Sequence, residues 1–123
     1  MRVIPTSVHG MLDYPLSILL IAMPWLFGFA TGGAAMWVPI IAGVAMLGLS
    51  AFTAYEAGLV RTVPMSVHLI MDAVMGLVLA ASPWIFGFAD VVYLPHLILG
   101  LGEVGAALMT QTTPGHRLAR TAV

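Results

Sequence analysis

The stretch PWLFGFA at residues 24–30 returns as PWIFGFA at residues 83–89, and this duplicated phrase decides the fold. A proline loosens or kinks the helix that contains it, a tryptophan suits the interface between lipid and water, and a glycine can adopt the left-handed conformation that ends a helix. Each copy is therefore predicted to end a helix at a membrane surface; an aromatic ligand clamp is the alternative. The predicted helix-terminating and interfacial residues are Pro24, Trp25, Gly28, Pro83, Trp84 and Gly87.

The composition indicates an integral membrane protein. Hydrophobic residues make up 61% of the 123 residues and charged residues only 7%, whereas about a quarter of the residues in soluble domains are charged. Residues 1–123 are predicted to form a single membrane domain with the lipid bilayer as partner. The chain has no basic patch, so nucleic acid is not an expected partner. It has no cysteine, which excludes disulfides, thiolate metal ligands and a cysteine nucleophile.

Four segments are long and apolar enough to cross a bilayer, which takes about 20 residues. They are roughly residues 7–28, 35–55, 65–87 and 92–111. All basic side chains lie before the first segment, between the second and third, or in the C-terminal tail: Arg2, Arg61, Arg117 and Arg120. An even number of crossings puts these three places on one side, and the positive-inside rule makes that side cytoplasmic. We therefore expect a multi-pass protein with both termini in the cytoplasm.

A shift of 59 residues superimposes the two halves of the sequence. It pairs His9 with His68 and runs through both PW phrases; a small deletion then changes the shift to 57, which pairs Thr53 with Thr110. Because each unit holds two crossings, the units form parallel repeats with equivalent residues at equal depth. We predict an all-α bundle of four transmembrane helices, built from two tandem helical hairpins at about residues 3–56 and 62–112 and followed by a short polar tail at 113–123.

These two hairpins resemble the SPW repeat family of small bacterial integral membrane proteins. The resemblance rests on the phrase (S/M)-P-W-(L/I)-F-G-F at the end of the first span of each hairpin, and it covers nearly the whole chain. The letters SPW stand at residues 82–84, whereas Met23 replaces the serine in the first copy. The resemblance implies the membrane repeat fold in the bacterial cytoplasmic (inner) membrane, and it implies no particular chemistry.

Ionisable residues inside the predicted spans form a second duplicated motif, H-x-x-x-D. His9 with Asp13 is the first copy and His68 with Asp72 is the second. The spacing puts both side chains of a pair on one helix face, and at 1.5 Å per residue the aspartates lie on the order of 10 Å inside the membrane. Glu103 reaches a similar depth and has no acidic counterpart in the first repeat. Ionisable groups at such depth usually mark a functional site, so we expect these five residues to line a cup that opens to the cytoplasm.

The expected cup allows two classes of function. In the first, the chain binds or conducts a cation, a proton or a small polar ligand; imidazoles and carboxylates suit a borderline divalent metal, and two histidines at equal depth also suit a haem. In the second, the chain is a structural or accessory protein, such as an oligomeric scaffold or a subunit of a larger complex, whose His–Asp pairs only stabilise helix packing. No recognisable nucleophile–base set, nucleotide loop or redox motif is present, so an enzyme is not expected. Glu103 favours the first class, since a structural pair needs no third carboxylate.

Glycines in the second and fourth spans are predicted to allow close helix contacts, either within the chain or between copies. These glycines are Gly43, Gly48, Gly100, Gly102 and Gly105. Because a thin bundle has little internal core, we also expect the chain to associate with copies of itself or with a larger membrane complex.

Overall fold

The computed structural model describes residues 2–115, which form four α-helices and no β-strand. The helices are α1 (Thr6–Leu26), α2 (Ala34–Ala51), α3 (Met65–Ile85) and α4 (Leu94–Met109). The first three are long and apolar enough to cross a membrane, and α4 is a shorter apolar helix of 16 residues. The all-α prediction is confirmed. The last part of the tail, with Arg117 and Arg120, lies outside the described residues.

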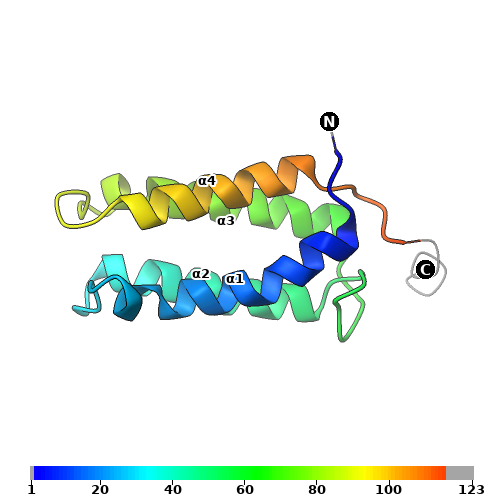
Figure 1. The fold of residues 1–123 in the computed structure, drawn as a ribbon, viewed down its shortest axis with the longest axis horizontal. Helices are drawn as coiled ribbons and strands as arrows, with labels where there is room; N and C mark the ends of the chain where they lie inside the picture. Colours follow the sequence, from blue (N-terminus) through cyan, green and yellow to red (C-terminus); the bar gives the residue numbers. More distant parts are fainter. Residues whose placement is uncertain (1, 116–123) are drawn as a thin grey trace.

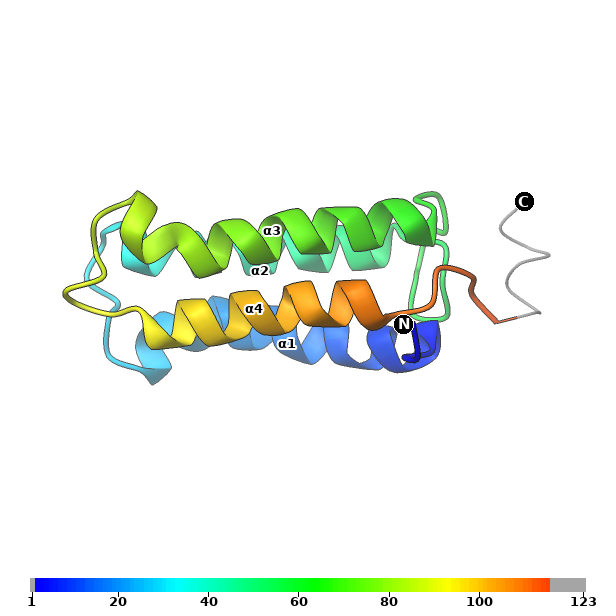
Figure 2. The same cartoon turned by 90° about the horizontal axis from the view of Figure 1, so that it is seen from above.

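Two antiparallel hairpins form the two layers of the bundle (Figure 1). Helix α1 packs on α2 in one layer, and α3 packs on α4 in the other. Figure 2, seen from above, shows α3 over α2 and α4 over α1. Both ends of the described chain lie at one end of the bundle, which we call the termini end and which includes residues 2–5, 52–64 and 110–115. The opposite end, with residues 27–33 and 86–93, is called the PW end.

At the PW end, each PW phrase lies at the last turn of its helix. Helix α1 continues for two residues past Pro24, and Gly28 follows with a positive φ of 74°. The amide of Phe29 donates to the carbonyl of Pro24 at 2.8 Å, which closes the helix end. The second copy repeats this geometry, with a φ of 73° at Gly87. Phe29 is buried whereas Trp25 is 60% exposed, so the phrase adds one aromatic ring to the core and leaves the indole on the surface.

Glycines at the helix crossings permit close packing within each hairpin. A Cβ added at Gly43 of α2 would lie 2.6 Å from the carbonyl oxygen of Ser17, and one added at Gly100 of α4 would lie 2.5 Å from that of Gly76. The other glycines predicted to mediate contacts have no atom within 4 Å of an added Cβ: Gly48, Gly102 and Gly105. Of the five predicted glycines, Gly43 and Gly100 therefore allow close packing within the chain, and Gly76 of α3 faces Gly100 at the same crossing.

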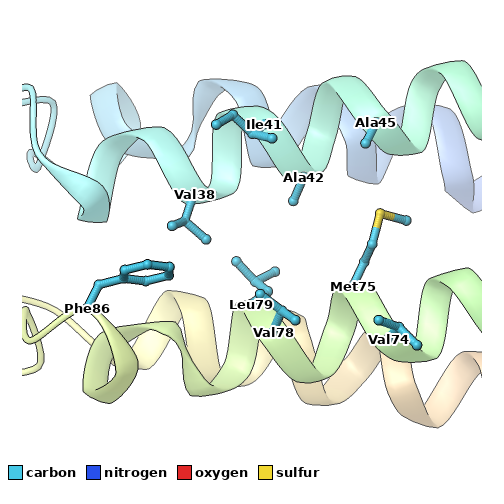
Figure 3. Close-up of a pocket in the computed structure, with 9 residues that line it drawn as sticks. All are labelled: Val38, Ile41, Ala42, Ala45, Val74, Met75, Val78, Leu79 and Phe86. Carbon is cyan, nitrogen blue, oxygen red and sulfur yellow. The ribbon is translucent and has the colours of Figure 1, made fainter.

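The interior of the PW half is mainly apolar, with His96 as its one buried ionisable side chain among the described residues. Leu20, Met46 and Leu79 belong to one buried cluster that joins the two hairpins. Beside this core, an apolar groove of about 300 Å³ remains between α2 and α3, and Figure 3 shows Val38 of α2 and Met75 of α3 pointing into it. Lipid tails are as apolar as these side chains, so the groove suits a surface that faces hydrocarbon. The polar side chains of the interior are concentrated in the other half.

Candidate functional site

The first turns of α1 and α3 bring the two H-x-x-x-D motifs together. Each helix begins directly after a proline in an extended conformation, Pro5 or Pro64. Helix α1 also contains Pro15, and Figure 1 shows its N-terminal part rising toward the second hairpin. A proline inside a helix removes a backbone hydrogen bond and bends the helix. This bend carries His9 and Asp13 toward α3.

The side chains of His9, Asp13, His68 and Asp72 meet in the bundle interior, and we call them the His–Asp cluster. The Nε2 atom of His9 lies 3.1 Å from Oδ1 of Asp13 and 2.9 Å from Oδ2 of Asp72. The Nε2 atom of His68 lies 3.3 Å from Oδ2 of Asp13 and 3.0 Å from Oδ2 of Asp72. Each imidazole therefore contacts the aspartate of its own helix and that of the other repeat.

The connection between α2 and α3 covers the cluster at the termini end. Tyr55 is fully buried, and its hydroxyl donates to Oδ2 of Asp13 at 2.5 Å. Burial and the negative charge of Asp13 raise the pKa of Tyr55 far above its usual value, so the hydroxyl remains a donor. Thr6 of α1 fixes the same connection by donating to the carboxylate of Glu56 at 2.7 Å. No cluster residue is more than 5% exposed, so the structure has a closed site where the sequence predicted an open cup.

A threonine at the end of each hairpin contacts the histidine of the other repeat. Thr53 Oγ1 lies 2.7 Å from Nδ1 of His68, and Thr110 Oγ1 lies 2.8 Å from Nδ1 of His9. Each hydroxyl donates its own hydrogen to the carbonyl four residues earlier, at 2.6 Å in both cases. Because a hydroxyl has only one hydrogen, it must accept from the imidazole. Nδ1 of both histidines therefore carries a hydrogen, and Nε2 is the atom left for the aspartates.

Backbone hydrogen bonds also connect the end of each hairpin to the other repeat. The amide of Ala54 donates to the carbonyl of Val63 at 2.7 Å, and the amide of Gln111 donates to the carbonyl of Ile4 at 2.8 Å. The end of each hairpin is thus bonded to the residues that lead into the first helix of the other repeat. These bonds place the two threonines beside the two histidines.

With Nδ1 protonated, the cluster has two electrically balanced states. Either both imidazoles are also protonated at Nε2 and pair with two carboxylates, or both Nε2 lone pairs and two carboxylate oxygens bind a divalent cation. The four candidate ligand atoms lie within 4.8 Å of one another, and tetrahedral coordination at about 2.0–2.2 Å separates ligand atoms by roughly 3.3–3.6 Å. Nε2 of His68 has no aligned hydrogen-bond partner, although carboxylate oxygens lie 3.0 and 3.3 Å away. The arrangement therefore fits a four-coordinate metal site.

Haem does not fit between the two imidazoles. Their ring centroids are 5.4 Å apart and the rings are nearly perpendicular, at 77°. The carboxylates of Asp13 and Asp72 contact both Nε2 atoms and occupy the place that a porphyrin would need.

Of the predicted site residues, the structure brings together the four of the His–Asp cluster and leaves Glu103 outside the group. Both carboxylate oxygens of Glu103 are buried without a hydrogen-bond partner. The PW phrases lie at the far end of the bundle.

Sequence reasoning gave no role to Thr53, Thr110 or Tyr55. The repeat pairing of Thr53 with Thr110 was the signal for the two threonines, whereas Tyr55 is aligned with a residue of another type, Thr112.

Comparison with known families agrees with the duplicated architecture. The model of the SPW repeat domain matches residues 7–110, a range that holds the whole His–Asp cluster and both threonines. No curated protein and no solved structure matches the chain. Because the family match covers most of the sequence, the chain belongs to the SPW repeat family.

Proposed function

We propose that this chain is a small membrane protein that binds one divalent transition-metal cation in the His–Asp cluster, where the ion clasps the two repeats together. The observation that carries this proposal is the convergence of one candidate ligand atom from each of the four residues within 4.8 Å, with the Nε2 atoms of both histidines beside the two carboxylates. Two neutral imidazoles and two carboxylates suit a borderline ion such as Zn²⁺ or Fe²⁺ and balance its charge. Thr53 and Thr110 supply the outer hydrogen bond that metal-bound histidines usually make through the second ring nitrogen.

The surroundings of the cluster favour a retained ion over a conducted one. On the PW side, the interior is filled by apolar side chains such as Leu20, Met46 and Leu79. On the termini side, Tyr55 lies over Asp13 and is itself fully buried. Four protein ligands and no open coordination position are typical of structural metal sites. The function supported best is therefore a metal-clasped membrane scaffold.

A second candidate needs no metal. In it, both histidines are imidazolium ions and the cluster is a staple of crossed ion pairs that only stabilises helix packing. The N···O distances of 2.9–3.1 Å for three of the four pairs favour this candidate, because charge-assisted hydrogen bonds have similar lengths. Metal content separates the two candidates.

Elemental analysis of the protein purified without chelator tests the proposal. We expect one Zn²⁺, Fe²⁺ or similar ion per chain in the wild type and none in His9→Ala/His68→Ala. His96→Gln is the matched control, because His96 is also buried but lies at the start of α4, where its Nε2–H donates to the carbonyl of Ala35 at 2.9 Å. This control should retain the metal. A wild-type protein that stays metal-free after incubation with Zn²⁺, Fe²⁺ and Mn²⁺ would leave the metal-free staple as the function.

Thermal unfolding of the wild type gives a test that does not depend on any variant folding. A metal held only by the folded state stabilises it by about 2.7 kcal/mol when its free concentration is 100 times the dissociation constant. We therefore expect a higher melting temperature with Zn²⁺ or Fe²⁺ than with a chelator. Equal melting temperatures under both conditions would contradict the metal proposal.

A further inference from the structure

A pocket of about 190 Å³ lies between α3 and α4 at the termini end, and the metal proposal does not use it. Its polar lining consists of Arg2, Ser66 and Thr112, and all three residues are exposed. Its apolar lining includes Ile70 of α3 and Leu108 of α4, which are 63% and 58% exposed. The pocket therefore combines polar and apolar side chains and is open to the surroundings of the bundle.

The order of the lining residues along α3 matches the order of groups in a phospholipid. Ser66 is the second residue of α3, and Ile70 and Ala73 follow one and two turns later. At 1.5 Å per residue, Ala73 lies about 10 Å further along the helix than Ser66. Because the first three helices are long and apolar enough to cross a membrane, the termini end belongs at an interface between lipid and water. The polar part of the pocket is thus at the level of lipid headgroups, and the apolar part is at the level of acyl chains.

Arg2 supplies a positive charge that is held in place and still has hydrogen-bond donors to offer. Its Nη1 atom donates to the carbonyls of Ala107 and Thr110 at 2.8 and 2.7 Å, which fixes the guanidinium at the end of α4. A guanidinium has five N–H donors, and these two bonds use only the pair on Nη1. The donors on Nε and Nη2 are left, and this forked edge suits two oxygens of a phosphate. Within residues 2–115, no salt bridge reaches Arg2 and no acidic residue lines the pocket.

The corresponding pocket of the first repeat has an acidic residue in place of the arginine. It has a volume of about 340 Å³ and is lined by Ser7, the counterpart of Ser66 under the shift of 59, and by Glu56. Arg61, the counterpart of Arg2 under the same shift, is not among its lining residues. An anionic group would thus meet an arginine beside α3 and a carboxylate beside α1. The two pockets therefore differ in the ligand charge that they favour.

We propose that the pocket between α3 and α4 binds one anionic phospholipid of the surrounding membrane, with its phosphate at Arg2 and Ser66 and an acyl chain along Ile70 and Leu108. Basic pockets between transmembrane helices bind anionic headgroups in this way. The pocket favours an anionic over a zwitterionic lipid, because it has no carboxylate to pair with a positively charged headgroup. None of its lining side chains belongs to the His–Asp cluster, so the lipid site does not depend on metal binding.

Native mass spectrometry of the full chain tests this site. The protein is released from micelles that contain equal amounts of phosphatidylglycerol and phosphatidylcholine with identical acyl chains. We expect one retained lipid per chain and a preference of about 5-fold for phosphatidylglycerol, the contribution of one basic residue beside an anionic headgroup. Arg2→Gln, which removes the charge, should abolish the preference.

Ser66→Glu tests the site without breaking the bonds of Arg2 to α4. It places a carboxylate in the pocket, and an acidic residue in the first turn of a helix is favourable, so the variant should fold and should lose the preference. Ser7→Glu is the matched control, because it makes the same change of charge at the second residue of α1, and it should keep the preference. Equal retention of both lipids by the wild type would overturn the proposal. So would a Ser7→Glu variant that loses the preference as fully as Ser66→Glu.

Two further measurements on the same samples distinguish the lipid from other occupants. Glycerol 3-phosphate, which has the phosphate but no acyl chain, should not displace the lipid; displacement would assign the pocket to a soluble phosphate compound and overturn the proposal. Dimers that carry no phosphatidylglycerol and that dissociate in Ser66→Glu would make the pocket an interface between copies, which would also overturn it. Metal analysis separates this site from the metal site, because Ser66→Glu should retain the metal content of the wild type.

Discussion

The two repeats share the residues that build the His–Asp cluster and differ in the residues around it. Thr53 lies 2.7 Å from the imidazole of His68, and Thr110 lies 2.8 Å from that of His9. The backbone bonds that bring each threonine into place are also duplicated, at 2.7 and 2.8 Å. Each repeat supplies half of the cluster and supports the half that the other supplies. Neither hairpin alone can therefore form the site.

Outside the cluster, the repeats have diverged in ways that affect the two aspartates differently. Both oxygens of Asp13 are engaged, one by His9 and the other by Tyr55 and His68. At Asp72, Oδ1 has no partner, because the residue aligned with Tyr55 is Thr112, which is exposed. Duplication therefore accounts for the ligand set, and divergence leaves one carboxylate with a free oxygen.

Replacing the aspartates should have the largest effect on stability, and the size of the effect should differ between the two repeats. Removing one partner of a buried ion pair costs about 3–5 kcal/mol, and both Asp13→Asn and Asp72→Asn should lose the metal. The loss of unfolding free energy should be greater for Asp13→Asn, because its new NH₂ group must face an imidazole or the hydroxyl of Tyr55. At residue 72 the NH₂ group can take the place of the free Oδ1. Chemical unfolding in one lipid mixture measures the difference, and a larger loss for Asp72→Asn would contradict the described asymmetry.

Replacing the threonines should have a smaller effect that is equal in the two repeats. Thr53→Val and Thr110→Val each leave the Nδ1–H of a buried imidazole without an acceptor, which costs about 1–3 kcal/mol. Loss of such an outer hydrogen bond also typically weakens metal binding by about 10–100-fold. Thr53→Ser and Thr110→Ser retain the hydroxyl and should restore both properties. Metal titration and unfolding of the four variants are the measurements; serine variants as weak as the valine variants would exclude the hydrogen bond as the cause.

Helical spacing and duplication made much of the site predictable. The spacing of four residues placed His9 and Asp13 on one face, and parallel repeats placed His68 and Asp72 at the same depth. The closed character of the site was not predictable, because it depends on the connection between α2 and α3. That connection folds back so that Tyr55 reaches Asp13, and no periodicity governs its path.

The five predicted glycines differ in whether they lie on the buried face of their helix. The buried face of α2 includes Pro39, Gly43, Met46 and Ser50, a helical spacing that leaves out Gly48. The same phase in α4 includes Gly100 and leaves out Gly102 and Gly105. Among the five predicted glycines, the helical phase of the buried face selects Gly43 and Gly100 for contacts within the chain, as the structure has them. The other three remain predictions for contacts between copies.

Alanine substitutions at these glycines should have the smallest effects on stability, and the loss should be greater in the second hairpin than in the first. Overpacking costs about 1–3 kcal/mol, but alanine recovers about 1 kcal/mol of helix propensity. Gly100→Ala should destabilise most, because the new Cβ meets the backbone of both Gly76 and Ala80. Gly43→Ala should cost less, because one of the close atoms is in the flexible side chain of Ile21.

Gly102→Ala is the matched control, with no atom within 4 Å of the new Cβ, and it should be neutral or slightly stabilising. Melting temperatures of the three variants measure the order. If Gly102→Ala destabilised the protein as much as Gly100→Ala, the lipid-facing side of α4 would have to contact something beyond the chain itself. If this equal destabilisation were measured both in the monomer and in protein associated with other copies, contacts between copies would not explain it. The packing of α4 against α3 would then not control the stability of the second hairpin. The comparison of buried and exposed glycines thus tests the internal packing and the expected self-association with one set of variants.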